Sequence, residues 1–302
     1  MKDLLSDAAQ RAIAYLESLP ERRVRPDADA LAKLTELVEP LADAGMPAKD
    51  VLARLDRLAS SASVAMAGPR FFGFVIGGSL PASLAATWLS GAWDQCTGLH
   101  EVTPATAMLE SQSLEWMLDL LNLPRDCEAG FVTGATVANF TALAAARHSV
   151  LKQAGWDVEA DGLFGAPPIS VVMSEESHPS VVKSLGMLGL GRSRVARVPS
   201  DAQGRIRVDK IPAIRGPTVI ITQVGNVNTG RVTRLGRSAI SRGLKEPGFT
   251  WTAPSGCGRP PPRNTAISSP AWRTPIPGQP MLISGSTCPM TAVSRSFAMA
   301  RP

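Results

Sequence analysis

Apolar side chains recur at helical spacing along the N-terminal part of the chain. In residues 2–19 they fall near every third or fourth position until Pro20, which predicts an amphipathic helix. Residues 27–41 and 47–62 predict two further helices. We therefore expect a helical segment over residues 1–65, of the kind that packs on a partner or on its own domain.

Helix and strand patterns alternate between residues 66 and 230. The predicted helices are residues 79–95, 105–121, 136–153, 181–188 and 208–214, and the predicted strands are residues 129–132, 169–173, 194–198 and 218–224. This alternation predicts an α/β domain with a mostly parallel sheet. Ligands of such sheets bind at the carboxyl ends of the strands, where three polar loops of this chain lie.

The first polar loop joins a predicted strand to a predicted helix through Thr133–Asn139. Unpaired backbone N–H groups at a helix N-terminus suit a phosphate, and Gly134 lets the backbone approach a ligand closely. Thr136 can cap the helix and donate its hydroxyl to the same anion. An ordinary capped helix fits the pattern equally well. The loop lacks the glycines of a nucleotide-binding loop or a dinucleotide fingerprint.

The second polar loop carries His178, one of three histidines in the chain. Because it directly follows a predicted strand, its flat ring is well placed to stack on a flat cofactor. A turn histidine capped by Ser177 is the alternative, and the spacing leaves both open. His148 lies within a predicted helix, where a structural or exposed role is expected. The third loop, residues 225–230, contains Asn226.

Six residues, 69–74, contain three of the eight phenylalanines of the chain. In a sequence with 5% aromatic residues, such a cluster lines a pocket or packs in a core. Locally, core packing is the favoured interpretation.

The positive charge of the chain is concentrated in its last 72 residues. The whole sequence carries a net charge of +5, but ten basic and one acidic residue from Arg231 onward give that part +9, so the first 230 residues carry −4. A body with this charge argues against a nucleic-acid partner. Four cysteines without metal-ligand spacing predict a reduced, cytoplasmic protein. None of the apolar runs in the sequence is long enough to predict a membrane-spanning helix.

Together, the three loops, the aromatic cluster and Thr103-Pro104 before a long predicted helix resemble the pyridoxal-phosphate-dependent group II amino-acid decarboxylases, which include the aromatic amino-acid and glutamate decarboxylases. The resemblance covers about residues 60–230. It implies the aspartate-aminotransferase-like fold of pyridoxal-phosphate enzymes, incomplete at the C-terminus, an amino-acid substrate and a homodimer.

The resemblance also implies roles for particular residues. In the family, the turn that matches Ala135 and Thr136 holds the phosphate of pyridoxal 5'-phosphate, and the histidine that matches His178 stacks on its ring. The position of Asn226 lies beside the cofactor there and is often a threonine. The cofactor acts as an electron sink, and the family supplies an aspartate for its ring nitrogen and a lysine for the Schiff base.

Neither of these last two groups follows Gly230, where the family has them. Eleven of the 25 prolines lie in residues 231–302, periodicity disappears, and Lys245 is the only lysine of this part. Its surroundings are unlike a Schiff-base site. At face value, residues 231–302 predict a basic, proline-rich, disordered tail.

A shift of reading frame near Arg231 is a second explanation of the tail. In the shifted frame, each residue is encoded by the last base of one codon and the first two bases of the next. The residues this permits include the strings DPxGEICD across residues 232–240, HVDGAFGLW across residues 249–258 and SWATDAHKWLN across residues 276–286. The D of the second string is fixed, because Trp251 has one codon, ending in G, and Thr252 begins with AC. The lysine of the third needs an uncommon isoleucine codon at Ile283.

These strings supply the missing aspartate and the missing His-Lys pair in the family's order and spacing. We therefore expect an interrupted decarboxylase, whose chain as written folds poorly and does not decarboxylate. Three alternatives remain: another enzyme of the same fold such as an aminotransferase, a non-catalytic protein that keeps the phosphate pocket, and a nucleic-acid binder that uses the basic tail.

Overall fold

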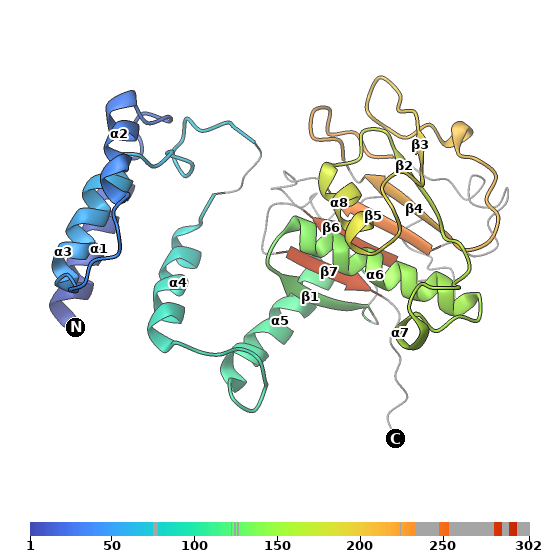
Figure 1. Cartoon of the computed structure of the whole chain (residues 1–302), viewed down its shortest axis with the longest axis horizontal. Helices are drawn as coiled ribbons and strands as arrows, with labels where there is room; N and C mark the ends of the chain where they lie inside the picture. Colours follow the sequence, from blue (N-terminus) through green and yellow to red (C-terminus); the bar gives the residue numbers. More distant parts are fainter. Residues whose placement is uncertain are drawn as a thin grey trace. The chain divides into compact units, whose positions relative to one another are not determined.

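The structure is a computed structural model that describes residues 1–74, 78–121, 123, 125, 127–223 and 225–233, and the backbone of three later strands. It consists of two compact units, Met1–Leu89 and Ser90–Pro302. From the sequence we expected the first boundary at residue 65. The boundary between the two compact units lies within a helix, α4 (Pro81–Trp93) (Figure 1), and the domain division expected at residue 65 stays a prediction.

The N-terminal unit is helical, as the apolar periodicity predicts. Its elements before α4 are α1 (Lys2–Ser18), α2 (Ala28–Lys33), the 3₁₀-helix η1 (Leu34–Leu37), α3 (Ala48–Leu55) and the π-helical turn η2 (Asp56–Ser60). Asp27 caps α2 by accepting the N–H of Ala30 at 2.8 Å. Arg11 of α1 contacts Asp56 at 3.0 Å, which ties the first helix to η2.

The aromatic residues near position 72 do not pack in a core. Phe72 is 93% exposed and Phe74 is 88% exposed, so the expectation of core packing is wrong for both side chains. Phe74 also has a φ of 58°, a left-handed conformation that is uncommon for a bulky side chain.

The second unit is built on a seven-stranded, mostly parallel sheet, which confirms the predicted α/β architecture. Its strand order is β1-β7-β6-β5-β4-β2-β3, with β2, β3, β4, β5 and β6 parallel and β7 antiparallel to both of its neighbours. The strands are β1 (Glu128–Val132), β2 (Ser170–Ser174), β3 (Val195–Val198), β4 (Thr218–Gln223), β5 (Gly248–Ala253), β6 (Met281–Gly285) and β7 (Met290–Ser294).

Side chains of β2 and β4 alternate between two cores because successive residues of a strand point to opposite faces. On one face, Val171 and Met173 pack with Val219 against α6 (Ala135–Gln153) and α8 (Pro179–Met187). Figure 1 shows these two helices on the same face of the sheet. On the other face, a second cluster covers the sheet; it comprises Val172, Val198, Ile206 and Ile220.

The remaining helices of this unit are short or lie before the sheet. They are α5 (Pro104–Leu120), α7 (Val158–Asp161) and the 3₁₀-helix η3 (Val208–Lys210). The helix predicted over residues 208–214 is limited to η3, because Pro212 lacks the N–H that a helix would need. Among the described residues, every helix is too short or too polar to cross a bilayer.

Three segments of the predicted disordered tail are strands. β5, β6 and β7 continue the sheet beyond β4, so the structure differs from the expectation at these places. The other residues after 233, Lys245 among them, lie outside the described part of the chain.

Candidate functional site

The carboxyl ends of the parallel strands gather the predicted loops at one edge of the sheet. β3, β2 and β4 are neighbours, so the loops that follow them lie side by side. β1 runs antiparallel to β7, and β7 runs antiparallel to β6. β1 therefore has the same direction as the parallel strands, and α6 begins at the same edge of the sheet.

The first turn of α6 presents backbone donors without a side-chain cap. The helix begins at Ala135, with Gly134 as an extended N-cap residue at φ 167° and ψ 171°. The first helical bond runs from Ala138 N to Gly134 O at 3.0 Å, so the N–H groups of Ala135 and Thr136 precede the hydrogen-bonded ladder. The expectation that Thr136 caps the helix is wrong, because this residue lies inside the first turn.

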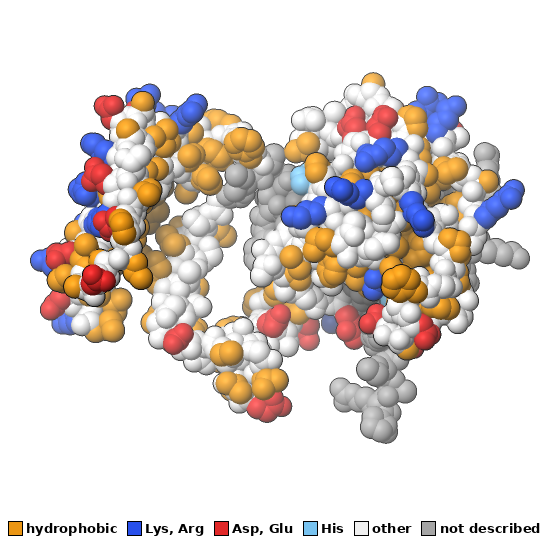
Figure 2. Space-filling view, viewed as in Figure 1, with side chains coloured by type: hydrophobic (Ala, Val, Ile, Leu, Met, Phe, Trp, Pro, Cys, Tyr) orange, Lys and Arg blue, Asp and Glu red, His pale blue; other side chains and the backbone are white. Residues whose placement is uncertain are grey.

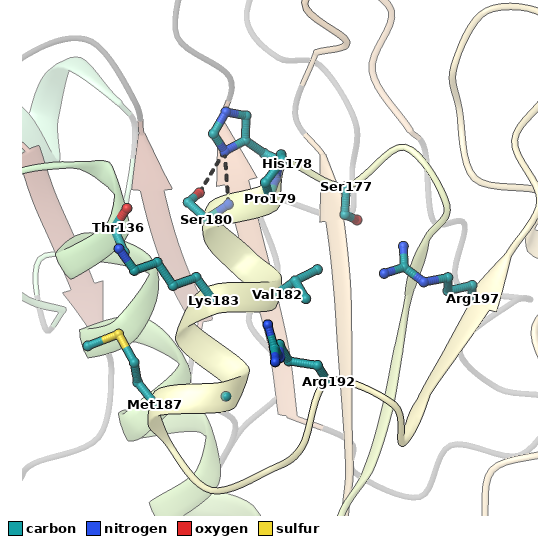
Figure 3. A pocket seen from close by; sticks show the side chains of 11 residues that line it. Thr136, Ser177, His178, Pro179, Ser180, Val182, Lys183, Met187, Arg192 and Arg197 are labelled. Carbon is teal, nitrogen blue, oxygen red and sulfur yellow. Dashed lines mark hydrogen bonds between the residues drawn. The ribbon is translucent and has the colours of Figure 1, made fainter.

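His178 is the N-cap of α8, and its ring is held by a residue of that helix. Its Nδ1 accepts the backbone N–H of Ser180 at 3.2 Å and lies 2.7 Å from the Ser180 hydroxyl (Figure 3). Because Nδ1 accepts an N–H, the neutral imidazole carries its proton on Nε2. The alternative that Ser177 caps the histidine is wrong: the Ser177 hydroxyl is buried without a partner among the described residues.

Asn139 connects α6 to this histidine. Its Nδ2 donates to the Ser180 hydroxyl at 2.8 Å, and both side chains are buried. One turn further along α8, the Ser184 hydroxyl donates to the backbone oxygen of Thr136 at 3.1 Å. These two bonds bring the start of α6 and the start of α8 together, and with them Thr136 and His178.

An open cavity of about 1040 Å³ lies at this junction. It is lined by Thr136, Ser177, His178, Pro179, Ser180, Val182, Lys183, Gly186, Met187, Arg192 and Arg197 (Figure 3). Three of these described residues are cations and none is a carboxylate, so the cavity favours an anion. Figure 2 shows basic side chains gathered on this face of the second unit.

Asn226 lies in the loop after β4 and does not line the cavity. It is 6% exposed, and its Nδ2 donates to Glu176 Oε2 at 2.8 Å. Its Oδ1 accepts the backbone N–H groups of Asn228 and Thr229 at 2.9 and 3.3 Å. The structure therefore brings two of the predicted residues, Thr136 and His178, into one cavity and places Asn226 in contacts between loops.

Several residues of the site escaped the sequence analysis. Asn139 and Ser180 are polar side chains on helix faces that are mostly apolar, and this was the available signal of a buried role. Nothing in the local pattern indicates that Arg192 and Arg197 turn toward the same cavity as His178. Within the described residues, no group of His, Cys, Asp and Glu is arranged to hold a metal ion.

Known proteins with similar sequences are amino-acid decarboxylases. The chain is 25% identical over 247 residues to the aromatic-L-amino-acid decarboxylase of Bacillus atrophaeus, a match that covers 79% of this chain and 49% of that protein. It is 30% identical over 178 residues to an acidic amino acid decarboxylase of Xenopus tropicalis, covering 59% of this chain and 33% of the relative. The chain thus spans about half or less of the length of these relatives.

Solved structures of such enzymes share the fold. Mouse CSAD in apo form superposes with a TM-score of 0.81 at 20% identity, covering 99% of this chain and 65% of that one. Oryza sativa TDC with PLP and tryptamine superposes with a TM-score of 0.77 at 18% identity, covering 97% of this chain and 66% of that one.

These matches confirm the predicted aspartate-aminotransferase-like fold. The family model described as the pyridoxal-dependent decarboxylase conserved domain matches residues 39–215, which is more than half of the 302 residues. The chain therefore belongs to the pyridoxal-dependent decarboxylase family.

Proposed function

We propose that this chain carries the cofactor-binding part of an amino-acid decarboxylase, a carboxy-lyase that uses pyridoxal 5'-phosphate. The observation that carries this proposal is the meeting of the α6 N-terminus and His178 at one cationic cavity. The proposal extends to a cytoplasmic homodimer that acts on an amino acid. The names of the relatives include aromatic and acidic amino acids, so the substrate is proposed only at the level of an amino acid.

The residues of the cavity fit the phosphate of this cofactor. The first-turn N–H groups of α6 and the positive end of its dipole favour an anion. The Thr136 hydroxyl lines the cavity, and the buried Ser177 hydroxyl lacks a partner in the described part of the chain, so both are available as donors. His178 offers a ring whose Nδ1 is already occupied by Ser180, which fixes the plane of the imidazole.

Each residue then has a defined task. When bound, pyridoxal 5'-phosphate supplies an aldehyde that condenses with an amine and a ring that accepts the electron pair left by departing carbon dioxide. Thr136 and the α6 backbone hold and orient its phosphate. His178 packs against the ring and presents Nε2–H as a donor, while Asn139 and Ser180 keep the imidazole from turning.

We further propose that the reading frame of the gene shifts near Arg231. The stretch after Gly230 then lacks the Schiff-base lysine and the ring-pairing aspartate, and the 302-residue chain binds the cofactor without decarboxylating. A non-catalytic protein that keeps the phosphate pocket, or another enzyme of the same fold, is the alternative.

Resequencing the gene from the codon of Thr218 onward tests the proposed shift. We expect that one inserted or deleted base restores the HVDGAFG and DAHKW strings in frame, and that the restored protein releases carbon dioxide from an amino acid. A confirmed frame together with turnover by the present chain would contradict both the shift and the proposed inactivity. Turnover by the restored protein without carbon dioxide release would favour an aminotransferase-like enzyme.

A further inference from the structure

The loops that follow β2, β3 and β4 meet at Glu176, two residues before His178. Because β2 lies between β4 and β3, its loop, residues 174–178, is flanked by the loops that follow those two strands. Glu176 lies in the central loop, Asn226 in the loop after β4, and Gly204 in the loop after β3. We propose that these three residues form a loop clamp that positions His178 at the cavity; the role of His178 itself rests on the proposed function.

The Asn226 amide can adopt only one orientation in this clamp. Its Oδ1 accepts the N–H groups of Asn228 and Thr229, which leaves Nδ2 to face Glu176. Nδ2 donates to Glu176 Oε2 at 2.8 Å, and hydrogen bonds to a charged acceptor are stronger than neutral ones. The loop after β4 is therefore bonded directly to the loop that carries His178.

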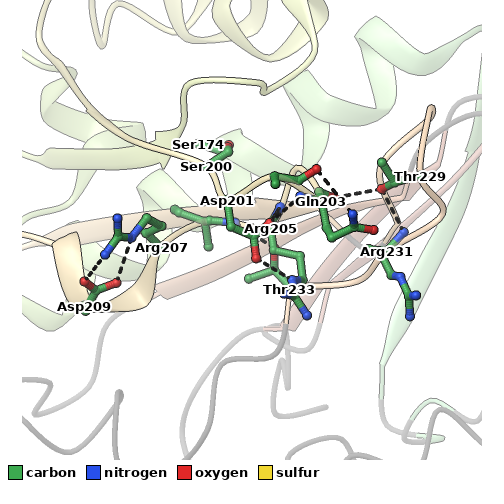
Figure 4. Close-up of polar contacts among 12 residues, drawn as sticks. Ser174, Ser200, Asp201, Gln203, Arg205, Arg207, Asp209, Thr229, Arg231 and Thr233 are labelled. Atoms are coloured by element: carbon green, nitrogen blue, oxygen red, sulfur yellow. Dashed lines mark hydrogen bonds and ion pairs between the residues drawn. The ribbon is translucent and has the colours of Figure 1, made fainter.

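The backbone of Glu176 is held on both sides. Its N–H donates to the Ser174 hydroxyl at 3.2 Å, and its carbonyl oxygen accepts Nε2 of Gln223 at 3.2 Å. The Ser174 hydroxyl lies 2.8 Å from that of Ser200, in the loop after β3 (Figure 4). With its carboxylate on Asn226 as well, Glu176 has little freedom to move, and neither has His178, the N-cap of α8, two residues later.

Gly204 closes the clamp from the third side. Its φ of 70° favours glycine, and a Cβ at this position would overlap Asn226 Nδ2 and lie 2.7 Å from Asn226 Cγ and 3.0 Å from Glu176 Oε2. The Thr229 hydroxyl donates to the backbone oxygen of Gln203 at 2.7 Å, so the same two loops are bonded beside the close approach (Figure 4).

A swap of polarity tests the bond between Glu176 and Asn226. Asn226→Asp places two carboxylates against each other, although the new side chain still accepts the two backbone N–H groups. Glu176→Gln combined with Asn226→Asp restores a donor and an acceptor with the polarity reversed. Hydrogen exchange of the amides of residues 175–178 and the dissociation constant for pyridoxal 5'-phosphate, by equilibrium dialysis, are measured on the full chain.

We expect Asn226→Asp to raise both the exchange rates and the dissociation constant about tenfold, in line with a lost hydrogen bond to a charged group. The double variant should return both values to within about threefold of wild type. A double variant no better than Asn226→Asp would overturn the clamp, as would residues 175–178 of the wild-type chain exchanging as fast as an unfolded peptide.

Gly204 and Gly216 provide a test substitution and its matched control for the role of Gly204 in the loop clamp. Gly204 and Gly216 have nearly equal φ values of 70° and 72°, but a Cβ at Gly216 would meet no atom within 4 Å. Gly204→Ala should therefore act like Asn226→Asp on the loop amides, and Gly216→Ala should not. Equal effects of the two substitutions would show that backbone strain alone is responsible and would overturn the role of Gly204.

The two readouts separate the clamp from the proposed function. One outcome is that the amides of residues 175–178 respond to Asn226→Asp and to the double variant in a chain that does not bind pyridoxal 5'-phosphate. This result would support the loop clamp and contradict the proposed binding of the cofactor. Cofactor binding that Asn226→Asp leaves unchanged, together with unchanged exchange, would contradict the clamp and support the cofactor.

Discussion

At the scale of single residues, the state of His178 is set by its neighbour Ser180. The Ser180 N–H and hydroxyl both face Nδ1, and the hydroxyl also accepts the buried Asn139 amide. A histidine whose Nδ1 is an acceptor presents Nε2–H outward. The sequence showed that His178 follows a strand, but it did not show that Asn139 of α6, 41 residues before Ser180, donates to the hydroxyl beside the ring.

Ser180→Ala removes the acceptor of the Asn139 amide and the hydroxyl beside His178. We expect the free energy of unfolding to fall by about 1–3 kcal/mol, because a buried amide loses a hydrogen-bond acceptor. The nitrogen chemical shifts of the His178 ring should still show the Nε2–H tautomer, because the backbone N–H of residue 180 still donates to Nδ1. Urea titration and NMR measure the two effects.

Ser193→Ala is the control for this substitution because Ser193 is exposed and lies in the loop after α8. It should change the unfolding free energy by no more than about 0.5 kcal/mol. Equal effects of the two serine substitutions, or a dominant Nδ1–H tautomer in Ser180→Ala, would refute the assigned contacts of His178.

At the scale of elements, the turn after β3 depends on one carboxylate. Asp201 Oδ1 accepts the N–H groups of Gln203 and Arg205 at 2.9 and 3.0 Å, and Oδ2 accepts Arg205 Nε at 2.7 Å (Figure 4). The backbone N–H of Arg205 is the main cause that holds the pKa of the Asp201 carboxyl below its usual value, and the Arg205 side chain adds to it. This turn carries Gly204 of the loop clamp.

The stabilisation from Asp201 should therefore disappear in acid. A carboxyl whose pKa is lower in the folded than in the unfolded state stabilises the fold above its unfolded pKa of about 3.9, and the effect is lost as the pH falls through the folded pKa. We expect Asp201→Ala to be less stable than wild type at pH 6, and the difference to shrink as the pH falls below about 3.9. Urea titrations at a series of pH values measure this difference, and a difference that persists unchanged in acid would contradict the assignment.

Much of the element order follows from the sequence, and the exceptions have physical causes. The periods of apolar residues predicted α1, α5, α6, β2 and β4 closely. Of these elements, α6, β2 and β4 are buried in the core, whereas α1 has no buried residue and α5 has one. Residues 27–41 yielded only α2 and η1, since helix ends and short helices depend on tertiary contacts that local patterns do not contain.

The site was predictable only in part, for a reason of the same kind. Thr136 and His178 lie where a helix begins after a strand, and such strand-to-helix loops are visible in the pattern. The bond between Asn226 and Glu176 joins positions 50 residues apart, and it forms because β2 and β4 pair. No local pattern could show that the Asn226 amide is used between loops.

At the scale of the whole molecule, exposed apolar side chains support the proposed homodimer. On α5, Met108 is 65% exposed, Leu109 59% and Trp116 63%, and their spacing places all three on one face of the helix. We expect Trp116→Glu to weaken self-association at least tenfold in sedimentation equilibrium, because it places a charge in an apolar contact. Phe164→Glu is the control, since Phe164 is 97% exposed but lies outside α4 and α5. An unchanged dimer in Trp116→Glu, or a monomeric wild-type chain, would contradict this surface.

The expectation of poor folding stays a prediction, now with a more specific form. A continuous core joins α6 and α8 to β2 and β4, all of which precede residue 224. We therefore expect the chain to unfold in one cooperative transition whose free energy lies below the usual range of about 5–15 kcal/mol. The restored reading frame should raise this value.

Binding of pyridoxal 5'-phosphate to the purified chain tests the central claim most directly. Equilibrium dialysis should show saturable binding of one cofactor per chain, weakened at least tenfold when pyridoxal without the phosphate is used and in the variant His178→Ala. Lys152→Ala is a control for adventitious reaction with lysine, because this residue lies at the far end of α6 and should not matter. A folded chain that binds no cofactor, or binds it equally well without the phosphate, would contradict the assignment of this cavity.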